Sequence, residues 1–211
     1  MTEVTIPGLS ADPLTLEAIE RRMQDRFPTL ATHIQYGELT IHVTPDALIE
    51  VLTFCRDDDE LRCGMLVDLS GVHWPAGDHV IDRQPSTTGW PEYRVSRDQG
   101  VIEVLYIVRS IERNHWFRLS LPTSDENPRL PSATSVYASA DYPEREVYDF
   151  FGVEFDGHPN LTRILMPDDW VGHPHRKDYP LGGVNVPYEN DKFIPPPNER
   201  DLRDIVGGEG P

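Results

Sequence analysis

The sequence predicts an α+β fold: a mixed β-sheet with two or more helices packed on it, followed by a long, proline-rich and mostly irregular C-terminal extension. Helical patterns and strand-like runs alternate over the first 122 residues. The pattern then changes, because 12 of the 20 prolines fall between Pro122 and Pro197. We therefore expect an α+β domain over residues 1–122, a segment of short helix and loops over 123–182, and an extended tail over 183–211.

Two amphipathic helices are predicted in the first third of the chain. The first covers residues 12–27, where Asp12 fits the N-cap and Pro13 the first helical position. Apolar residues recur there at helical spacing until Pro28 ends the run. The second helix is expected in the run DALIEVLTFCRDDD, residues 46–59.

Strand-like runs surround these helices. The run THIQYGELTIHV, residues 32–43, predicts a β-hairpin split at Gly37 and Glu38. The run CGMLVDLSG, residues 63–71, predicts a short buried strand, and residues 72–94 are rich in Gly, Pro, Trp and Asp and predict a loop.

The clearest strand pair is VIEVLYIVRS, residues 101–110, with HWFRLSL, residues 115–121. Both faces of the first run are nearly all apolar, so we place that strand centrally in the sheet. In the second run Phe117, Leu119 and Leu121 share one face of the strand. Arg118 and Ser120 lie on the other face.

A short helix is predicted in YPEREVYDFFG, with Asp141 as its N-cap and Gly152 as its left-handed C-terminal stop. Beyond residue 155 the composition is typical of loops with few core-forming residues, and such a segment cannot easily fold alone. Two alternatives follow: this region is disordered, or it lies on the surface of another protein.

Composition excludes several classes of protein. With 19 Lys and Arg against 36 Asp and Glu, the formal charge is −17, which disfavours nucleic acids and anionic lipid as partners. The acidity fits either plain solubility or basic protein partners. Cys55 and Cys63 are too few for a disulfide scaffold and are expected to be buried free thiols of a reducing cytosol. We expect no membrane span, signal peptide or transit peptide.

A metal site could in principle use His158, His173, His175, Asp168 and Asp169, which are all legitimate ligand types. His173 and His175 flank a proline, so their side chains are expected to diverge, and no H-E-x-x-H pairing occurs. We expect these histidines to cap turns. A stand-alone metal-dependent hydrolase is the remote alternative.

Catalytic and nucleotide motifs are missing from the sequence. Glu144 and Glu146 are two residues apart and do not face each other on a helix, but both suit the positive end of a helix dipole. No nucleotide-binding glycine loop and no G-x-S-x-G elbow occurs. A dense cluster of charges and aromatic residues without a reaction is typical of a protein interface.

Two motifs carry a resemblance to a known family. The run EREVYDFFGVEFDGHPNLTRIL, residues 144–165, and the run GHPHRKDYPL, residues 172–181, resemble the 30-kilodalton subunit of respiratory complex I, the NuoC family of bacteria. Phe150 stands where that family usually has Met or Leu, and Tyr142 where it usually has Trp. The close match covers residues 130–182.

The resemblance implies a non-catalytic subunit of the peripheral arm of a proton-translocating NADH:quinone oxidoreductase, without a cofactor of its own. The complex as a whole would use NADH, FMN, iron–sulfur clusters and quinone. The implied partners are the 49-kilodalton-type quinone-site subunit and the iron–sulfur subunits, which would hold the chain on the cytoplasmic side of the bacterial plasma membrane. The main alternative is the equivalent scaffold in a membrane-bound hydrogenase or another non-NADH oxidoreductase.

The resemblance also implies that the motif residues form a joint between subunits, and for each of them the alternative is a hydrogen bond within the chain. Gly152 and Pro159 are expected to shape the backbone. The residues expected to contact partner subunits are Glu144, Arg145, Glu146, Tyr148, Asp149, His158, Arg163, Arg176, Lys177 and Asp178.

Overall fold

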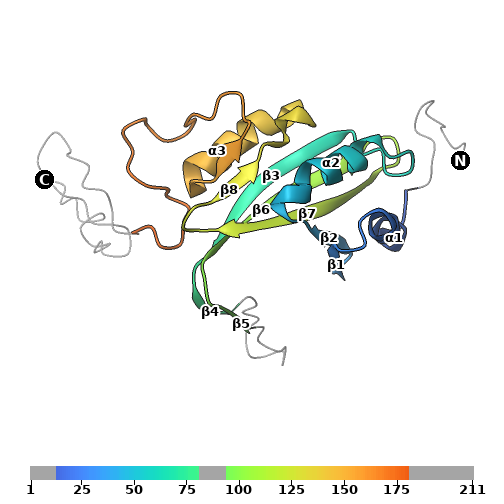
Figure 1. Cartoon of the computed structure of the whole chain (residues 1–211), viewed down its shortest axis with the longest axis horizontal. Helices are drawn as coiled ribbons and strands as arrows, with labels where there is room; N and C mark the ends of the chain where they lie inside the picture. Colours follow the sequence, from blue (N-terminus) through green and yellow to red (C-terminus); the bar gives the residue numbers. More distant parts are fainter. Residues whose placement is uncertain (1–12, 81–93, 181–211) are drawn as a thin grey trace, which may run out of the picture. The chain divides into compact units, whose positions relative to one another are not determined.

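The computed structural model describes residues 13–80 and 94–180 (Figure 1). The chain divides into two units, Met1–Lys177 and Asp178–Pro211. The fold described here belongs to the first unit, because the predicted tail over 183–211 lies outside the described residues.

A five-stranded mixed sheet forms the centre of the first unit, as the sequence predicts. Its strand order is β1-β2-β7-β6-β3, in which β2 pairs with β7 in parallel and the other neighbours are antiparallel. The predicted central place of residues 101–110 is confirmed, since β6 lies between β7 and β3. The strands are β1 (Ala31–Gln35), β2 (Glu38–His42), β3 (Met65–Trp74), β6 (Val101–Ser110) and β7 (His115–Ser124).

Helices supply the second layer. In β6 and β7 the fully buried side chains alternate with less buried ones, which places the core on one face of the sheet. Buried residues of α1, α2 and α3 belong to the same core, so these helices cover that face, and none of the helices in the described ranges lies on the other. The helices are α1 (Leu16–Arg26), α2 (Leu48–Asp57), preceded by the 3-10 turn η1 (Pro45–Ala47), and α3 (Asp141–Phe151).

The predicted N-caps of α1 and α3 are wrong. Helix α1 begins three residues later than expected, because Thr15 is its N-cap and accepts a hydrogen bond from the amide of Ala18 (3.2 Å). In α3, Asp141 is the first helical residue and Ala140 precedes it without a side-chain cap. The 3-10 turn η3 (Ala138–Ala140) runs directly into α3, so the start needs no cap of its own.

The predicted hairpin is confirmed, with its turn one residue earlier. Tyr36 and Gly37 form the turn with φ angles of 53° and 79°, and Gln35 pairs with Glu38. Positive φ at both central residues matches the right-handed twist of the flanking strands.

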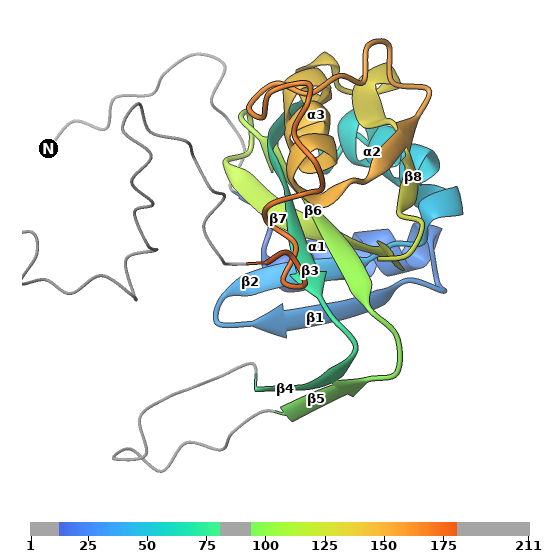
Figure 2. The ribbon, with the colours of Figure 1, turned by 90° about the vertical axis from the view of Figure 1, so that its left-hand side faces the viewer.

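The prediction of a short strand at 63–71 and a loop from residue 72 is wrong. Strand β3 extends from Met65 to Trp74, paired along its length with β6, and a two-stranded ribbon follows. In Figure 2 this ribbon projects from the ends of β3 and β6, away from α2 and α3. Pairing with the long apolar β6 outweighs the turn-forming composition; residues 81–93 lie outside the described residues. The ribbon consists of β4 (Gly77–Val80) and β5 (Arg94–Arg97).

Residues on both sides of position 122 contribute to one core. Leu130, Tyr137, Val147 and Phe155 are buried with the residues of the sheet. The predicted domain boundaries stay predictions. After Asp156 the described chain has no helix or strand up to residue 180, as expected for an irregular segment. The remaining elements are β8 (Arg129–Pro131), which pairs in parallel with β9 (Glu154–Asp156), and the 3-10 turn η2 (Ala133–Ser135).

Cys55 and Cys63 are buried free thiols, as predicted. Burial raises the pKa of Cys63 to about 12 and that of Cys55 well above its ordinary value. No helix within residues 13–80 and 94–180 is long and apolar enough to cross a bilayer.

Candidate functional site

The motif segment, which we define as residues 141–177, consists of α3 and the irregular chain that returns over it. Helix α3 packs on β3, where a side chain at Gly71 would lie 2.8 Å from the ring of Phe151. Glycine at this position therefore lets the helix approach the sheet closely. Helix α3 ends at Gly152, whose φ of +79° is left-handed.

Glu144 points into the protein and is fully buried. Its carboxylate accepts hydrogen bonds from the amide of Ala133 (2.6 Å) and the hydroxyl of Ser132 (2.7 Å), at the start of η2. Burial raises the pKa of Glu144 to about 7, helped by the nearby Asp141 and opposed by these two hydrogen bonds. Glu144 therefore joins α3 to η2 within the chain.

His158 occupies the same buried cluster. Its Nε2 lies 3.0 Å from the carbonyl oxygen of Asp141 and 3.9 Å from the carboxylate of Glu144, and its Nδ1 accepts a hydrogen bond from the amide of Asn160 (3.0 Å). One nitrogen donates and the other accepts, so the ring is the neutral Nε2–H tautomer. Pro159 is exposed in the turn between the two residues.

Asp149 is the second buried carboxylate of α3. It pairs with Arg163 (2.7 Å) and accepts hydrogen bonds from three successive amides, those of residues 164–166, at 2.8–3.1 Å. Burial alone would raise the pKa of Asp149, but the amides of Met166 and Leu165 and the guanidinium of Arg163 outweigh it and hold that pKa below its ordinary value. The carboxylate thus fixes the returning chain onto the helix.

Two arginines strengthen this attachment. Arg145 donates to the carbonyl oxygen of Thr162 (3.1 Å) and to its hydroxyl (2.9 Å), and its guanidinium lies 5.3 Å from the ring centre of Tyr142. Arg163 also donates to the carbonyl oxygen of Gly172 (3.2 Å). Both arginines therefore bind backbone or side chains of their own chain.

The predicted divergence of His173 and His175 agrees with their different contacts. His173 lies 3.0 Å from the carbonyl oxygen of Asp149 and meets Tyr148 edge-on, whereas His175 stacks on Phe150 with ring centres 3.9 Å apart. A side chain at position 152 would lie 2.6 Å from His173, a second reason for glycine there. Within the described ranges no group of three or more His, Cys, Asp or Glu side chains is placed to hold a metal ion.

The end of the motif segment is attached to the sheet. The amide of Lys177 donates to Nδ1 of His73 (2.8 Å), whose Nε2 lies 3.2 Å from the carboxylate of Asp125. Arg176 donates to the carbonyl oxygen of the same Asp125 (2.8 Å). No sequence pattern pointed to His73 or Asp125, because both lie far from the motifs along the chain.

Nine of the ten predicted interface residues therefore divide into two groups, and the tenth, Tyr148, is half-buried and contacts His173 edge-on. Most of their polar side chains bind within the chain; Ser132 and Thr162, two of the binding partners, carry no signal in the sequence. The side chains of Glu146, Lys177 and Asp178 are exposed. The residues bound inward by hydrogen bonds or ion pairs are Glu144, Arg145, Asp149, His158, Arg163 and Arg176.

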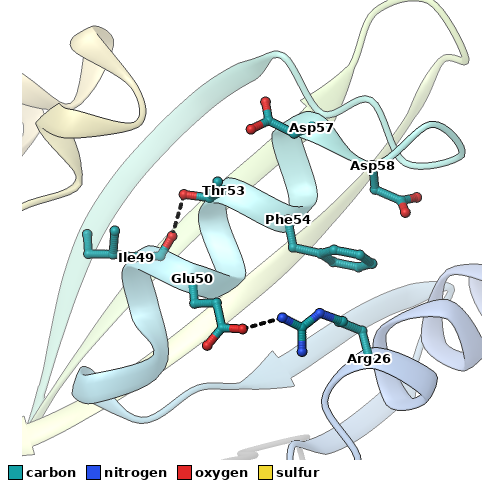
Figure 3. A pocket seen from close by; sticks show the side chains of 7 residues that line it. All are labelled: Arg26, Ile49, Glu50, Thr53, Phe54, Asp57 and Asp58. Carbon is teal, nitrogen blue, oxygen red and sulfur yellow. Dashed lines mark hydrogen bonds and ion pairs between the residues drawn. The ribbon is translucent and has the colours of Figure 1, made fainter.

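A separate cavity of about 510 Å³ lies along the seam between α1 and α2 (Figure 3). Its acidic side chains all have arginine partners: Glu50 meets Arg26 (2.5 Å), Asp58 meets Arg22 (2.6 Å), and Asp57 meets Arg56 (2.6 Å). Thr53 donates to the carbonyl oxygen of Ile49 (2.7 Å). Because these groups bind one another, we interpret the cavity as a helix–helix seam rather than a catalytic site.

Two solved structures share this fold. A chain described as "Nqo5 of the trypsin-resistant fragment (1-134)" aligns with a TM-score of 0.50 at 24% identity, covering 68% of this chain and 98% of that one. A chain from the membrane-bound sulfane sulfur reductase, described as an archaeal respiratory membrane complex, aligns with a TM-score of 0.60 at 20% identity, covering 84% and 98%. At these identities the likeness defines the class of fold.

The family follows from sequence. Residues 41–185 match the family described as "Respiratory-chain NADH dehydrogenase, 30 Kd subunit", and the chain belongs to this family. An NADH-quinone oxidoreductase subunit of Acidothermus cellulolyticus is 40% identical over 209 residues, which are 95% of this chain and 98% of that protein. The corresponding protein of Salinispora tropica is 45% identical over 190 residues, 90% of this chain but only 65% of that longer protein. The resemblance of the two motifs is therefore confirmed.

Proposed function

We propose that this chain is a non-catalytic core subunit of the peripheral arm of a proton-translocating NADH:quinone oxidoreductase. It would position the 49-kilodalton-type quinone-site subunit and the iron–sulfur subunits relative to each other. The support is the family match over residues 41–185 together with relatives that are named as subunits of NADH-quinone oxidoreductase. In the complex, NADH, FMN, iron–sulfur clusters and quinone belong to other subunits.

The observation that carries the proposal is the inward binding of the motif charges. Because Glu144, Asp149 and Arg163 bind within the chain, they hold a long irregular segment in one conformation on α3. A segment that is ordered before association loses less conformational entropy when a partner binds. The motif residues are thus positioning residues for a docking surface. The large apolar side chains that this surface exposes are Tyr142, Leu165 and Val171.

The inward contacts change the role that we propose for each motif charge, and we still propose the motif segment as the joint between subunits. The partner contacts would be made by side chains that face solvent, such as Glu146 and Lys177, while the buried groups fix the backbone beneath them. The chain would be peripheral, on the cytoplasmic side of the plasma membrane, and held there by other subunits.

The alternative complexes are distinguished by sequence more than by fold. The sulfane sulfur reductase chain shares the fold at 20% identity, so the fold extends beyond NADH-linked enzymes. The 40% identity to an NADH-quinone oxidoreductase subunit over nearly the whole chain favours the NADH-linked complex. The subunits that bind the chain distinguish the NADH-linked complex from the hydrogenase-type complex, because a nickel-binding large subunit would indicate the latter.

The test is affinity purification of the tagged chain from gently solubilised membranes, with mass spectrometry of the recovered subunits and an assay of NADH oxidation by a quinone. Recovery of quinone-site, iron–sulfur and flavin subunits with activity supports the proposal. Recovery of the chain alone, or with a hydrogenase large subunit, refutes it.

Arg145→Ala probes the motif segment in the same experiment. Loss of its bonds to Thr162 loosens the returning chain, so the amount of assembled complex should fall while the activity per assembled complex stays unchanged. Arg21→Ala, on the exposed side of α1, is the matched control. Normal assembly with a slowed quinone step would contradict the positioning role.

A further inference from the structure

Exposed apolar side chains gather at one end of the sheet, on the strands β3, β6 and β7. Met65 is 42% exposed and Val67 46% on β3; Ile111 is 63% exposed in the β6–β7 turn; and Trp116 is 39% exposed on β7. These four and Arg109 of β6 form what we call the sheet-end patch. Single exposed apolar residues are ordinary, but a contiguous group marks an interaction site.

The strand register makes the patch continuous. Met65 pairs directly with Arg109, and Arg109 pairs directly with Trp116, so the three side chains form one row across three strands. The neighbours of Arg109 along β6, Val108 and Ser110, are fully buried. The row therefore lies on the face of the sheet opposite the three described α-helices.

Arg109 supplies the charge at the centre of the row. Its guanidinium is exposed and donates to the side-chain oxygen of Asn114 (2.8 Å). Within the described part of the chain it forms no ion pair with a carboxylate, whereas Arg62 is already paired with Glu112, the chain neighbour of Ile111 (3.0 Å). Arginine, tryptophan and methionine are all enriched at protein interfaces, the first two also at binding hot spots, and the fork geometry of the guanidinium suits a carboxylate.

Backbone pairing at the edge of β3 is disfavoured as the mode of contact. The register with β6 shifts between Leu66 and Asp68, which inserts a β-bulge, and the hydroxyl of Ser139 donates to the carbonyl oxygen of Leu66 (3.4 Å). Bulges twist an edge away from further strands. A partner would therefore bind the side chains of the patch.

The positive charge of Arg109 and the net charge of the chain indicate which kind of partner binds the sheet-end patch. A two-fold contact between copies of this chain would bring Arg109 near its own copy, which is repulsive. Anionic lipid and nucleic acid suit a chain of formal charge −17 poorly. We propose that the sheet-end patch docks a different polypeptide, which presents apolar side chains around a carboxylate that pairs with Arg109. This rests on the proposed function, since the partner is another subunit of the complex, and it adds a surface separate from the motif segment.

The test places a photo-crosslinking amino acid at position 111 of the tagged full-length chain, in cells that assemble the complex. We expect one crosslink, to another subunit, at a peptide that contains Asp or Glu. Arg109→Glu should reduce its yield by about 30-fold, the effect of losing a hot spot of about 2 kcal/mol. Arg109→Lys should reduce it less, and Arg21→Glu, a charge reversal on α1, should leave it unchanged.

A crosslink to a second copy or to lipid, no crosslink, or a yield unaffected by Arg109→Glu would overturn the inference. Thermal unfolding of the purified variants separates a local effect from misfolding, because Arg109→Glu should melt with the wild type. Failure of the proposed function has a different signature: the unmodified chain then recovers no respiratory subunits. In that case an Arg109-dependent crosslink to an identified acidic peptide would establish the patch as a docking surface and refute a subunit of the complex as its partner.

Discussion

Replacement of the buried Glu144 by glutamine should stabilise the protein above neutral pH. The folded pKa of Glu144 is about 7, raised from 4.5 mainly by burial, so the folded state binds the proton more tightly than the unfolded state. The stabilisation that this proton provides is complete below about pH 4.5 and is lost as the pH rises through 7. The other titratable groups that face the carboxylate are Asp141, His158 and Tyr106.

The magnitude follows from the two pKa values. At about 1.4 kcal/mol per pKa unit, the rise in the pKa from 4.5 to about 7 corresponds to about 3 kcal/mol between acidic and alkaline pH. Glutamine is neutral at every pH, and its carbonyl oxygen can still accept the hydrogen bond from Ala133. Glu144→Gln should therefore lie within about 1 kcal/mol of the wild type at pH 5 and exceed it by about 3 kcal/mol at pH 8.

The assay is urea unfolding of the purified chain at pH 5 and pH 8, followed by circular dichroism. Glu146→Gln is the matched control, since this neighbouring glutamate on α3 is exposed and should show no pH-dependent difference from the wild type. A Glu144→Gln variant that is less stable than the wild type at pH 8 would refute the reasoning, because it would mean that the ionised carboxylate stabilises η2.

Three further outcomes are expected. Asp149→Asn removes the charge that pairs with Arg163 and should lower the free energy of unfolding at pH 7 by about 3–5 kcal/mol. The difference from the wild type should shrink at acidic pH, where Asp149 of the wild type is protonated as well. Urea unfolding over a range of pH measures this difference, and a difference that stays constant would contradict the reasoning. Gly152→Ala should lower the free energy of unfolding by about 1–3 kcal/mol, because alanine disfavours the left-handed backbone and its methyl group would clash with His173. The melting temperature should fall, and an unchanged melting temperature would contradict this expectation. Cys63 should resist a thiol reagent in the native chain and react in urea, since burial raises its pKa to about 12; rapid native labelling would show that it is accessible.

Local patterns in the sequence were enough to predict most of the fold. Period 3.6 identified α1 and α2, and the apolar run of β6 identified the centre of the sheet, because these patterns report burial directly. The extension of β3 to Trp74 could not be predicted locally. It depends on pairing with β6, which overrides a stretch rich in turn-forming residues.

The motifs were enough to locate the candidate site, but they did not indicate whether its charged side chains point into the protein or toward solvent. A glutamate in the first turn of a helix is usually exposed, and Glu144 is buried only because Ser132 and Ala133 present hydrogen-bond donors to it from another part of the chain. The three amides that surround Asp149 are likewise created by the returning loop. Such contacts depend on tertiary structure, which spacing along the sequence does not encode.

The parallel pairing of β2 with β7 has a consequence for how the chain is made. Thr40 and Arg118, which pair in this register, are 78 residues apart. At about 5–20 residues per second, a ribosome needs roughly 4–16 s to synthesise that interval. During this time the edge of β2 that later pairs with β7 has no partner strand, and the hydrophobic core is incomplete. The growing polypeptide thus passes through an aggregation-prone interval that ends only when β7 leaves the ribosome, which would favour chaperone binding to the nascent N-terminal segment.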